Sequence, residues 1–253
     1  MLLVNAMVVL ATAVSAAPFV ERSINSTNWT PEHILQPGEI ILYGEGRMEV
    51  VHESVYNELI ASQALSEHPG DFTDAVETTS AHSTSKLHTR DSCDLITAVI
   101  TDRTQTFVDW DVQMSPVVIG TGNGMDVSVS SGYTVGNSIS VSVGLDLNLI
   151  KEKLGGSAGI DYTRTWSTQT VITVKGTVAN GYSGVMITKP IKTRKSGRVL
   201  KGCLGSQTQT GTFSADSYED GSYSGVKWVS GAITMCSKKE FPLSRCTGSG
   251  NFV

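Results

Sequence analysis

Apolar and polar residues alternate strictly between Asp126 and Ile150. Most odd positions from Val127 to Leu149 are apolar, while the even positions are all Gly, Ser, Thr, Asp or Asn. After Lys151–Gly156 the alternation resumes over 157–178, where the even positions are the more apolar set. Successive side chains of a strand point to opposite faces, so the pattern predicts two long strands that form an amphipathic hairpin. Its apolar face is expected to contain Val135, Ile139, Val141, Val143, Leu145, Leu147, Ile160, Tyr162 and Trp166.

Two physical uses suit such a hairpin. In one, its apolar face covers the core of an antiparallel sheet and its Ser/Thr face meets water. In the other, several copies contribute hairpins to a closed transmembrane ring, with apolar residues toward lipid, which needs only about 9 to 11 residues per span. The pattern alone favours the first use. Arg164, on the apolar face of the return strand, argues against lipid contact along the whole of that strand.

The rest of the chain has the composition of short strands separated by turns. Apolar residues at helical spacing predict one helix over 48–65, and one helical turn is expected at 149–154. The predicted fold is mainly β: an elongated antiparallel sheet or sandwich with a long amphipathic hairpin and a small α/β or helical N-terminal segment. Further strands are predicted at 39–43, 95–100, 104–110, 185–188, 199–204, 208–214, 223–229 and 232–236.

The N-terminus has the features of a secreted protein. Residues 1–17 resemble a cleaved signal peptide, with an apolar run over 2–14 and small residues at 15–17. Asn25 and Asn28 each begin an N-glycosylation sequon, which has meaning only in a secretory pathway. We therefore expect a secreted, extracellular glycoprotein.

The chain contains four cysteines. An even number in an exported chain predicts two disulfides, and three connectivities remain open. Zinc sites favour close ligand pairs and no C-x-x-C spacing is present, so we expect no metal and no other cofactor. The cysteines are Cys93, Cys203, Cys236 and Cys246.

Charge divides the chain near Arg90. Residues 18–90 hold eleven acidic and four basic groups, whereas 91–253 hold thirteen and fifteen, so the two parts carry about −7 and +2. The stretch from Ser66 to Arg90 has linker composition. Residues 18–90 are therefore either a pro-segment, cut after Arg90, or a small appended module that is never removed. Residues 91–253 are expected to form a disulfide-bonded all-β domain.

A run of cations without any acid lies between 189 and 201. Such a strip suits binding to anionic lipid headgroups or acidic glycans, where each cation near an anionic membrane contributes about 1 kcal/mol. More often, a charge run is a solvated loop. The acidic first part would screen the strip until it is separated. The strip consists of Lys189, Lys192, Arg194, Lys195, Arg198 and Lys201.

Signals for catalysis are weak, and we expect no enzyme. No histidine follows Cys93, which excludes a Ser-His-Asp or Cys-His arrangement in 91–253. The glycine-rich loop 120–124 lacks the Lys-Ser/Thr ending of a phosphate loop. Paired carboxylates remain as hydrolase candidates, although a solvated strand and a polar turn are the simpler explanations. These groups are Asp109 and Asp111 beside Trp110, and Asp216, Glu219 and Asp220 beside Tyr218 and Tyr223.

Two resemblances extend these expectations. The Ser/Thr-rich alternating stretch from about Asp126 to Lys189 resembles the insertion region of aerolysin-type β-pore-forming toxins. The region from Tyr133 to Cys246 is similar to secreted effector-like proteins of plant-associated ascomycete fungi. That similarity implies an extracellular protein that acts at a host interface and elicits cell death, and it carries no catalytic residues. Its motifs are TRTWST (163–168), CLGS (203–206), DSYEDGSYSGVKW (216–228) and FPLSRC (241–246).

The sequence thus predicts a secreted, non-enzymatic effector or toxin-like protein that acts on host or competitor cells. The expected mechanism is binding to a host cell surface or membrane through the basic strip, homo-oligomerisation, and insertion of the hairpin. The alternative is a non-pore-forming binding module, either a glycan binder or an inhibitor of a host enzyme, in which the hairpin is only a scaffold. No nucleic-acid partner is expected.

Overall fold

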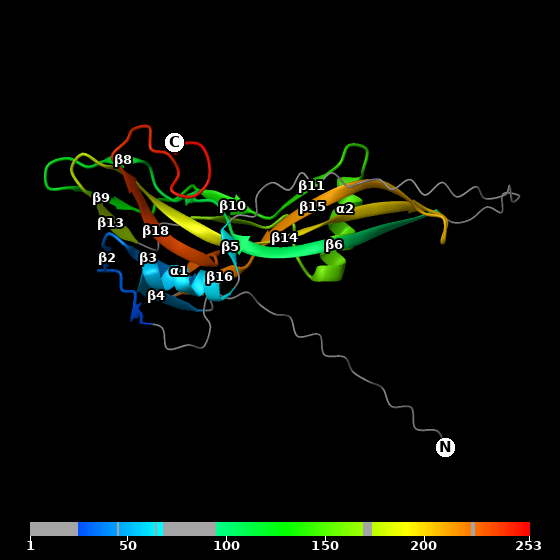
Figure 1. The fold of residues 1–253 in the computed structure, drawn as a ribbon, viewed down its shortest axis with the longest axis horizontal. Coiled ribbons are helices and arrows are strands. Elements are labelled where there is room, and N and C mark those ends of the chain that lie inside the picture. Colours follow the sequence, from blue (N-terminus) through cyan, green and yellow to red (C-terminus); the bar gives the residue numbers. More distant parts are fainter. Residues whose placement is uncertain (1–24, 45, 64, 68–94, 169–173, 224–225) are drawn as a thin grey trace, which may run out of the picture.

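The computed structural model describes residues 25–44, 46–63, 65–67, 95–168, 174–223 and 226–253, which form an elongated, mainly β molecule (Figure 1). The predicted fold class is confirmed. In chain order the elements are β1 (Thr27–Asn28), β2 (Ile34–Leu35), β3 (Glu39–Gly44), β4 (Arg47–His52), α1 (Glu53–Ser62), β5 (Ser66–Glu67), β6 (Ile96–Val108), β7 (Val112–Gln113), β8 (Val118–Ile119), β9 (Met125–Ser128), β10 (Thr134–Gly136), β11 (Ser138–Val141), α2 (Leu147–Ala158), β12 (Thr165–Ser167), β13 (Lys175–Val178), β14 (Ser183–Gly202), β15 (Thr208–Tyr218), β16 (Asp220–Tyr223), β17 (Val226–Val229) and β18 (Gly231–Lys238).

Strand β14 runs through most of the molecule. Its 20 residues span roughly 65 Å at the usual rise of a strand. The first part of β14 pairs with β18 on one edge and with β7 and β8 on the other. The second part pairs with β15 and with β6 on these same two edges. We call the part around β18 the wide half, and the part formed by β6, β14, β15, β11 and α2 the narrow half.

Pro190 lies where β14 exchanges one partner for the next. It is the last residue paired with β18, opposite Gly231, and Lys192 is the first residue paired with β15. Proline has no N–H to donate, so a central strand accepts it only where the ladder is interrupted. Glycine is needed opposite, because a Cβ on Gly231 would lie 2.4 Å from the Lys189 carbonyl oxygen.

The wide half contains the main core. Side chains of β3, β4, β9, β13, β14, β17 and β18 meet there, and burial of a large apolar side chain stabilises the fold by about 1.5–3 kcal/mol. Outside this core, the segment after β18 packs Leu243 and Phe252 against Val185 and Ile187 of β14. The main core comprises Trp29, Leu35, Ile41, Tyr43, Met48, Val50, Met114, Val127, Val129, Trp166, Val174, Val178, Met186, Trp228, Val229 and Ile233.

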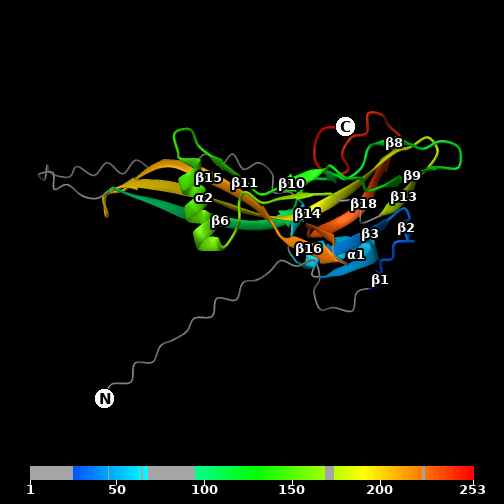
Figure 2. The same cartoon turned by 180° about the vertical axis from the view of Figure 1, so that it is seen from behind.

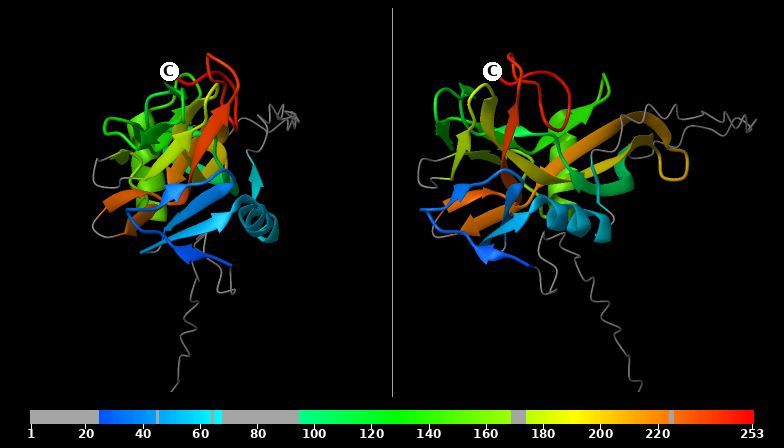
Figure 3. Two further views of the ribbon diagram at one scale, coloured as in Figure 1. Left: turned by 90° about the vertical axis from the view of Figure 1, so that its left-hand side faces the viewer. Right: turned by 60° about the vertical axis from the view of Figure 1, so that its left-hand side comes forward.

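The acidic first part of the chain belongs to the same sheet as the rest. β3 pairs with β18, with Tyr43 opposite Gly231 and Ile41 opposite Ile233, and Figure 3 shows β3 and β4 in blue beside β18. Tyr43 and Ile41 have no exposed surface. The boundary expected near Arg90 therefore separates two compositions but not two folding units. Arg90 and most of the expected linker lie outside the described residues.

Some predicted element boundaries are wrong. Residues 47–52 form β4 rather than helix, and α1 begins at Glu53, where the His52 ring accepts a hydrogen bond from the Ser54 N–H. The strands predicted at 95–100 and 104–110 are one strand, β6. Its register against β14 shifts around Asp102, which lies between the paired residues Thr101 and Arg103. The bulge interrupts the alternation on which the sequence prediction depends.

One of the two expected disulfides is described in full, joining Cys236 to Cys246. Cys203 is also disulfide-bonded, and Cys93 lies outside the described residues, as does the predicted signal peptide. Asn25 and Asn28 are both exposed. Neither α1 nor α2, the helices in the described ranges, is long and apolar enough to cross a membrane.

We predict that cleavage after Arg90 leaves the first part bound to the second. Separation would remove β3 from β18 and expose the buried Ile41 and Tyr43. The cleaved protein should elute from a sizing column as one species, while a denaturing gel shows two fragments. Elution of the fragments apart under native conditions would contradict the shared sheet.

Candidate functional site in the predicted hairpin

The half of the predicted hairpin nearest its two ends, which we call the lower half, is formed as predicted by β9 and β10 with β12 and β13. β9 pairs antiparallel with β13, with Val127 opposite Gly176, and β10 pairs antiparallel with β12, with Val135 opposite Trp166. In both ladders an odd-numbered residue of the outgoing strand faces an even-numbered residue of the return strand. The two apolar sets of the sequence therefore share one face, as the alternation predicts. Residues 169–173 lie outside the described part of the chain.

The upper half is not a hairpin, so the prediction of two uninterrupted strands is wrong. β11 pairs with β15, with Val141 opposite Phe213, instead of with the return strand. Residues 147–158 form α2, which contacts β6 and β11 and appears in front of the narrow half in Figure 2. The segment 138–163, which we call the diverted segment, thus lies folded against the body of the protein.

Local signals explain why α2 forms. The Asp146 carboxylate caps its first turn, accepting hydrogen bonds from the Asn148 and Leu149 N–H groups. Gly159 ends the helix with a left-handed backbone, φ 65°, and its N–H donates to the Gly155 carbonyl. Against these, Gly155 and Gly156 lie inside the helix, where each is about 1 kcal/mol less favourable than Ala.

α2 buries two residues that are one helical turn apart. Ile150 and Leu154 pack with Phe213 of β15 and Val199 of β14 in the core of the narrow half. Four-residue spacing places them on one face of the helix. Ile150 is not part of the odd-numbered apolar set of the outgoing strand, and Leu154 lies in 151–156, between the two predicted strands. This core also holds Tyr162 and Ala215, with Val99, Ile139, Val141, Leu145 and Ile160 packed around it.

Two members of the period-two apolar set are exposed in the folded protein. Val143 is fully exposed at 102% of its reference surface, and Leu147 is 37% exposed. Val143 lies in a loop and Leu147 in the first turn of α2, so the strand pattern continues where the fold forms no strand. The sequence therefore carries two overlapping patterns, a helical one that the structure uses and a strand one that it leaves partly unused.

Polar contacts hold this region to β15 and β16. One oxygen of Asp220 accepts hydrogen bonds from the Arg164 guanidinium (2.5 Å) and the Trp166 indole N–H (2.7 Å). Arg164 also stacks over the Trp166 ring at 4.9 Å, so this arginine lies against the protein. The Tyr218 N–H donates to the Asn137 side chain. Sequence reasoning placed Asp220 in a polar loop and missed its partners, which are more than 50 residues away.

The attachment of the diverted segment is incomplete. The Tyr162 hydroxyl is buried and has no hydrogen-bond partner among the described residues. A buried unsatisfied group of this kind costs about 1–3 kcal/mol. Directly after β11, Ser142 Oγ accepts a hydrogen bond from the Thr212 N–H. The segment thus combines specific contacts with one buried polar group that lacks a partner among the described residues.

The predicted basic strip is divided between two environments. Lys192 and Arg194 are largely buried, and their charges are paired. Lys192 Nζ lies 2.7 Å from Asp109 Oδ2 and 3.3 Å from Asp216 Oδ2. Arg194 makes a two-pronged contact with Asp216 at 2.7 and 2.8 Å. We call these four residues with Tyr218, whose hydroxyl donates to Asp109, the ion cluster.

The remaining cations of the strip lie along the surface of β14. Arg198 pairs with Asp102 at 3.3 Å, and both side chains are about half exposed. Lys201 is exposed, Lys195 is half-buried, and Lys189 lies 6.0 Å from the centre of the Tyr56 ring. The six cations therefore do not form a single surface for an anionic ligand, although Lys195, Arg198 and Lys201 remain near the end of the narrow half.

The ion cluster brings together two of the candidate hydrolase carboxylates, Asp109 and Asp216. Burial alone would raise the pKa of Asp216, but hydrogen bonds and charge from Arg194 and Lys192 hold it below its ordinary value. Burial and the Asp109 charge raise the pKa of Tyr218. A general acid must keep its proton near neutral pH. The arrangement therefore favours satisfied ion pairs over acid catalysis.

The other candidate carboxylate, Asp111, lies apart from the cluster. It accepts a hydrogen bond from the Thr247 N–H at 2.6 Å, and the Arg245 guanidinium donates to its carbonyl, so it anchors the C-terminal segment. One of its oxygens lies close to the Cys236–Cys246 sulfurs. Those sulfurs are joined to each other and have no thiolate to offer a metal.

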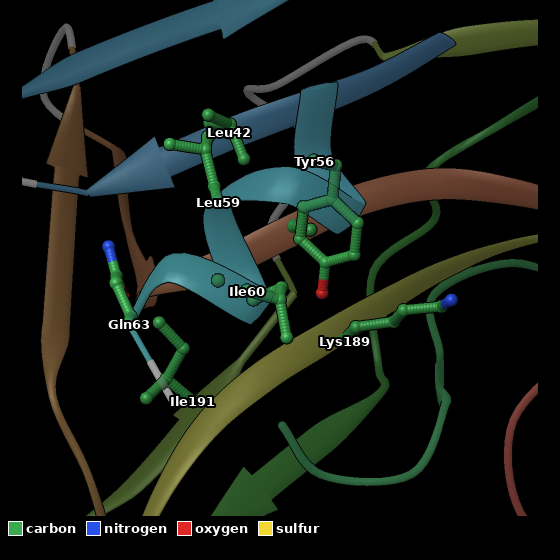
Figure 4. A pocket seen from close by; sticks show the side chains of 9 residues that line it. Leu42, Tyr56, Leu59, Ile60, Gln63, Lys189 and Ile191 are labelled. Atoms are coloured by element: carbon green, nitrogen blue, oxygen red, sulfur yellow. The ribbon is translucent and has the colours of Figure 1, made fainter. Parts of the chain in front are cut away.

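A small cavity lies between α1 and β14. Figure 4 shows Tyr56 and Ile60 of α1 directed toward Lys189 and Ile191 of β14. Its volume of about 10 Å³ holds one water molecule, whereas small-molecule sites usually measure about 300–1,000 Å³. It is a packing gap under the helix. The lining residues are Leu42, Tyr56, Leu59, Ile60, Gln63, Lys189, Ile191, Gly231 and Ala232.

Comparison of the chain with models of known protein families, with curated proteins and with solved structures finds no match.

We predict that Asp216→Asn destabilises the protein by about 3 kcal/mol, because Arg194 loses its carboxylate partner and Lys192 keeps only Asp109. Urea unfolding measures the change. Asp102→Asn breaks the exposed pair with Arg198 and should cost less than about 1 kcal/mol. Because the folded pKa of Asp216 is lowered, its contribution is present above the unfolded pKa and is lost as pH falls through the folded value. The free energy of unfolding of Asp216→Asn should therefore fall less on acidification than that of the wild type. If Asp216→Asn and Asp102→Asn lowered the free energy of unfolding equally, the role of the cluster would be contradicted.

Proposed function

We propose that the protein is a secreted, toxin-like effector that permeabilises the membranes of host or competitor cells. Several copies associate, and the diverted segment 138–163 leaves the body and completes the hairpin that β9, β10, β12 and β13 begin. The observation that carries the proposal is the strand alternation beyond β11, which the folded protein leaves partly unused at Val143 and Leu147.

The lower ladders support this conversion. Because β10 and β12 are already paired, extending the hairpin adds residues to an existing antiparallel ladder and avoids the cost of forming a new one. The segment from Ile139 to Leu149 contains eleven residues, which matches the roughly 9 to 11 residues of a transmembrane strand. Closure among several copies would pair every hairpin edge within the bilayer.

Leaving the body has a cost that burial in the bilayer must offset. The diverted segment gives up the four residue pairs between β11 and β15 and its packing in the narrow core, and it uncovers Val199 and Phe213. A twelve-residue helix is marginal in water without such packing. The apolar side chains that leave the narrow core would be buried again in lipid, so much of the lost burial returns.

Extracellular action is supported by chemistry that suits an oxidising compartment. The Cys236–Cys246 disulfide is typical of exported proteins. Asn25 and Asn28 are exposed, as glycosylated residues must be. Arg198, which pairs with Asp102, and Lys201 are exposed toward the end of β14, and they suit a first contact with an anionic surface.

The direct test is dye release from anionic liposomes by the full-length secreted protein, with oligomer size measured on unheated SDS gels. Release that accompanies SDS-resistant oligomers would support the proposal. A stable monomer that neither binds liposomes nor releases dye would instead favour the extracellular binding module.

Val143→Asp should reduce dye release by roughly tenfold or more, because a charge on the lipid face is strongly unfavourable. Val143 is fully exposed in the folded protein, so the variant should fold and be secreted normally. Ser140→Asp is the matched control: it adds the same charge at an exposed position, on the polar face of the alternation and outside α2. Equal release by both variants would remove the segment as the spanning element.

Gly156→Ala should slow dye release by stabilising α2 by about 1 kcal/mol. A Cβ at Gly156 meets no atom within 4 Å, so no clash opposes this gain. Asn57→Ala is the control, because it strengthens α1, a helix that the proposal leaves intact. Stopped-flow dye release compares the rates, and no slowing by Gly156→Ala would contradict the unfolding of α2.

A further inference from the structure

The ladder between β10 and β12 sets the register in which the hairpin would continue. Val135 lies opposite Trp166, and the Asn137 N–H donates to the Arg164 carbonyl at 2.9 Å. This inference rests on the proposed function and takes the same register upward without a slip. The next pairs on the apolar face are Ile139 with Tyr162, Val141 with Ile160, Val143 with Ala158, Leu145 with Gly156, and Leu147 with Leu154.

In the continued register, charged residues lie at both ends of the apolar face. It closes at Ile150 and Lys151, so the charged residues Lys151, Glu152 and Lys153 form the tip, which must cross the bilayer and stay in water. At the other end Arg164 lies on the apolar face just below Ile139, where its long side chain reaches the interface. The apolar band between these ends has the length of one span.

The opposite face is polar and made of small residues. Small side chains facing inward leave room for water in a strand-lined pore. On the outgoing strand this face consists of Ser138, Ser140, Ser142, Gly144, Asp146 and Asn148, and on the return strand of Lys153, Gly155, Ser157, Gly159, Asp161 and Thr163.

Three charges lie on the spanning part of this face. Lys153, near the tip, is diagonal to Asp146, within the distance at which opposite charges on neighbouring strands pair. Asp161 lies opposite Ser140, with Gly159 and Thr163 beside it on its own strand, so no cation adjoins it. Nearer the body, Asp126 and Lys175 occupy the same face of β9 and β13 and carry opposite charges.

We propose that the pore conducts cations in preference to anions, and that the Asp161 carboxylates of the assembled copies form the ring that selects them. Rings of Asp or Glu select cations through the field they create in a narrow pore. The carboxylates act on passing ions from the wall of the pore.

Asp161 can be tested without disturbing the folded monomer. Its side chain is exposed, and Oδ1 accepts hydrogen bonds from the Thr163 N–H (2.8 Å) and hydroxyl (2.7 Å). Asparagine makes the same turn. Asp161→Asn therefore removes the charge while it keeps the local geometry, and the full-length variant should be secreted and bind liposomes like the wild type.

The experiment is the reversal potential of single channels in planar bilayers under a KCl gradient. The wild type should pass K⁺ severalfold better than Cl⁻, Asp161→Asn should lose most of this preference, and Asp161→Lys should reverse it. Glu58→Gln removes an exposed charge from α1 and should change nothing. Channels without cation preference, or an unchanged Asp161→Asn channel, would overturn this inference alone. Absence of any wild-type conductance would overturn the proposed function as well.

A chemical rescue tests which face Asp161 occupies. No free cysteine is found in the described part of the chain, so an introduced thiol can be modified selectively. In open channels of Asp161→Cys, a water-soluble thiol reagent that carries a sulfonate group should modify the cysteine. The attached negative charge should restore the cation preference. Ile160→Cys, on the lipid face, should not react. Reaction at Ile160→Cys but not at Asp161→Cys would reverse the two faces and overturn the proposal.

Discussion

The structure depends on the need to hydrogen-bond both edges of β14 along its full length. A single strand of this length has no single neighbour that matches it, so its partners change near Pro190, where a missing N–H causes no loss. Just beyond this point Lys192 and Arg194 require counter-charges, and β6 and β15 bring partners on either side. The ion cluster thus occupies the place where the wide and narrow halves are joined.

The sequence predicted those features that depend on neighbouring residues. Period-two alternation gave the partners β9 with β13 and β10 with β12 and the face that each residue occupies. The sequence predicted only one helical turn, at 149–154, where α2 runs from Leu147 to Ala158, because the helical pair Ile150 and Leu154 is embedded in a more regular strand pattern. The Asp146 cap was a signal that could have located the helix start.

Features that depend on distant residues were not accessible in this way. β14 contains Pro190 and a dense run of cations, which together have the composition of a solvated loop. Only the folded chain shows that Asp216, 22 residues after Arg194, makes these charges compatible with a buried strand. The integration of β3 beside β18 was likewise hidden, because acidic composition says nothing about strand pairing.

β11 lies at the outer edge of its sheet, so it can leave the sheet without unfolding the rest of the molecule. A strand in the middle of a sheet cannot leave without breaking two ladders, whereas β11 leaves by breaking one, and β14 with β6 and β15 remains intact behind it. We therefore expect the diverted segment to open as a unit of its own, with an opening free energy set by the β11–β15 ladder and by its packing in the narrow core. Evolution can tune the readiness of this unit to open by changing those contacts, while the spine of the molecule keeps its resistance to unfolding.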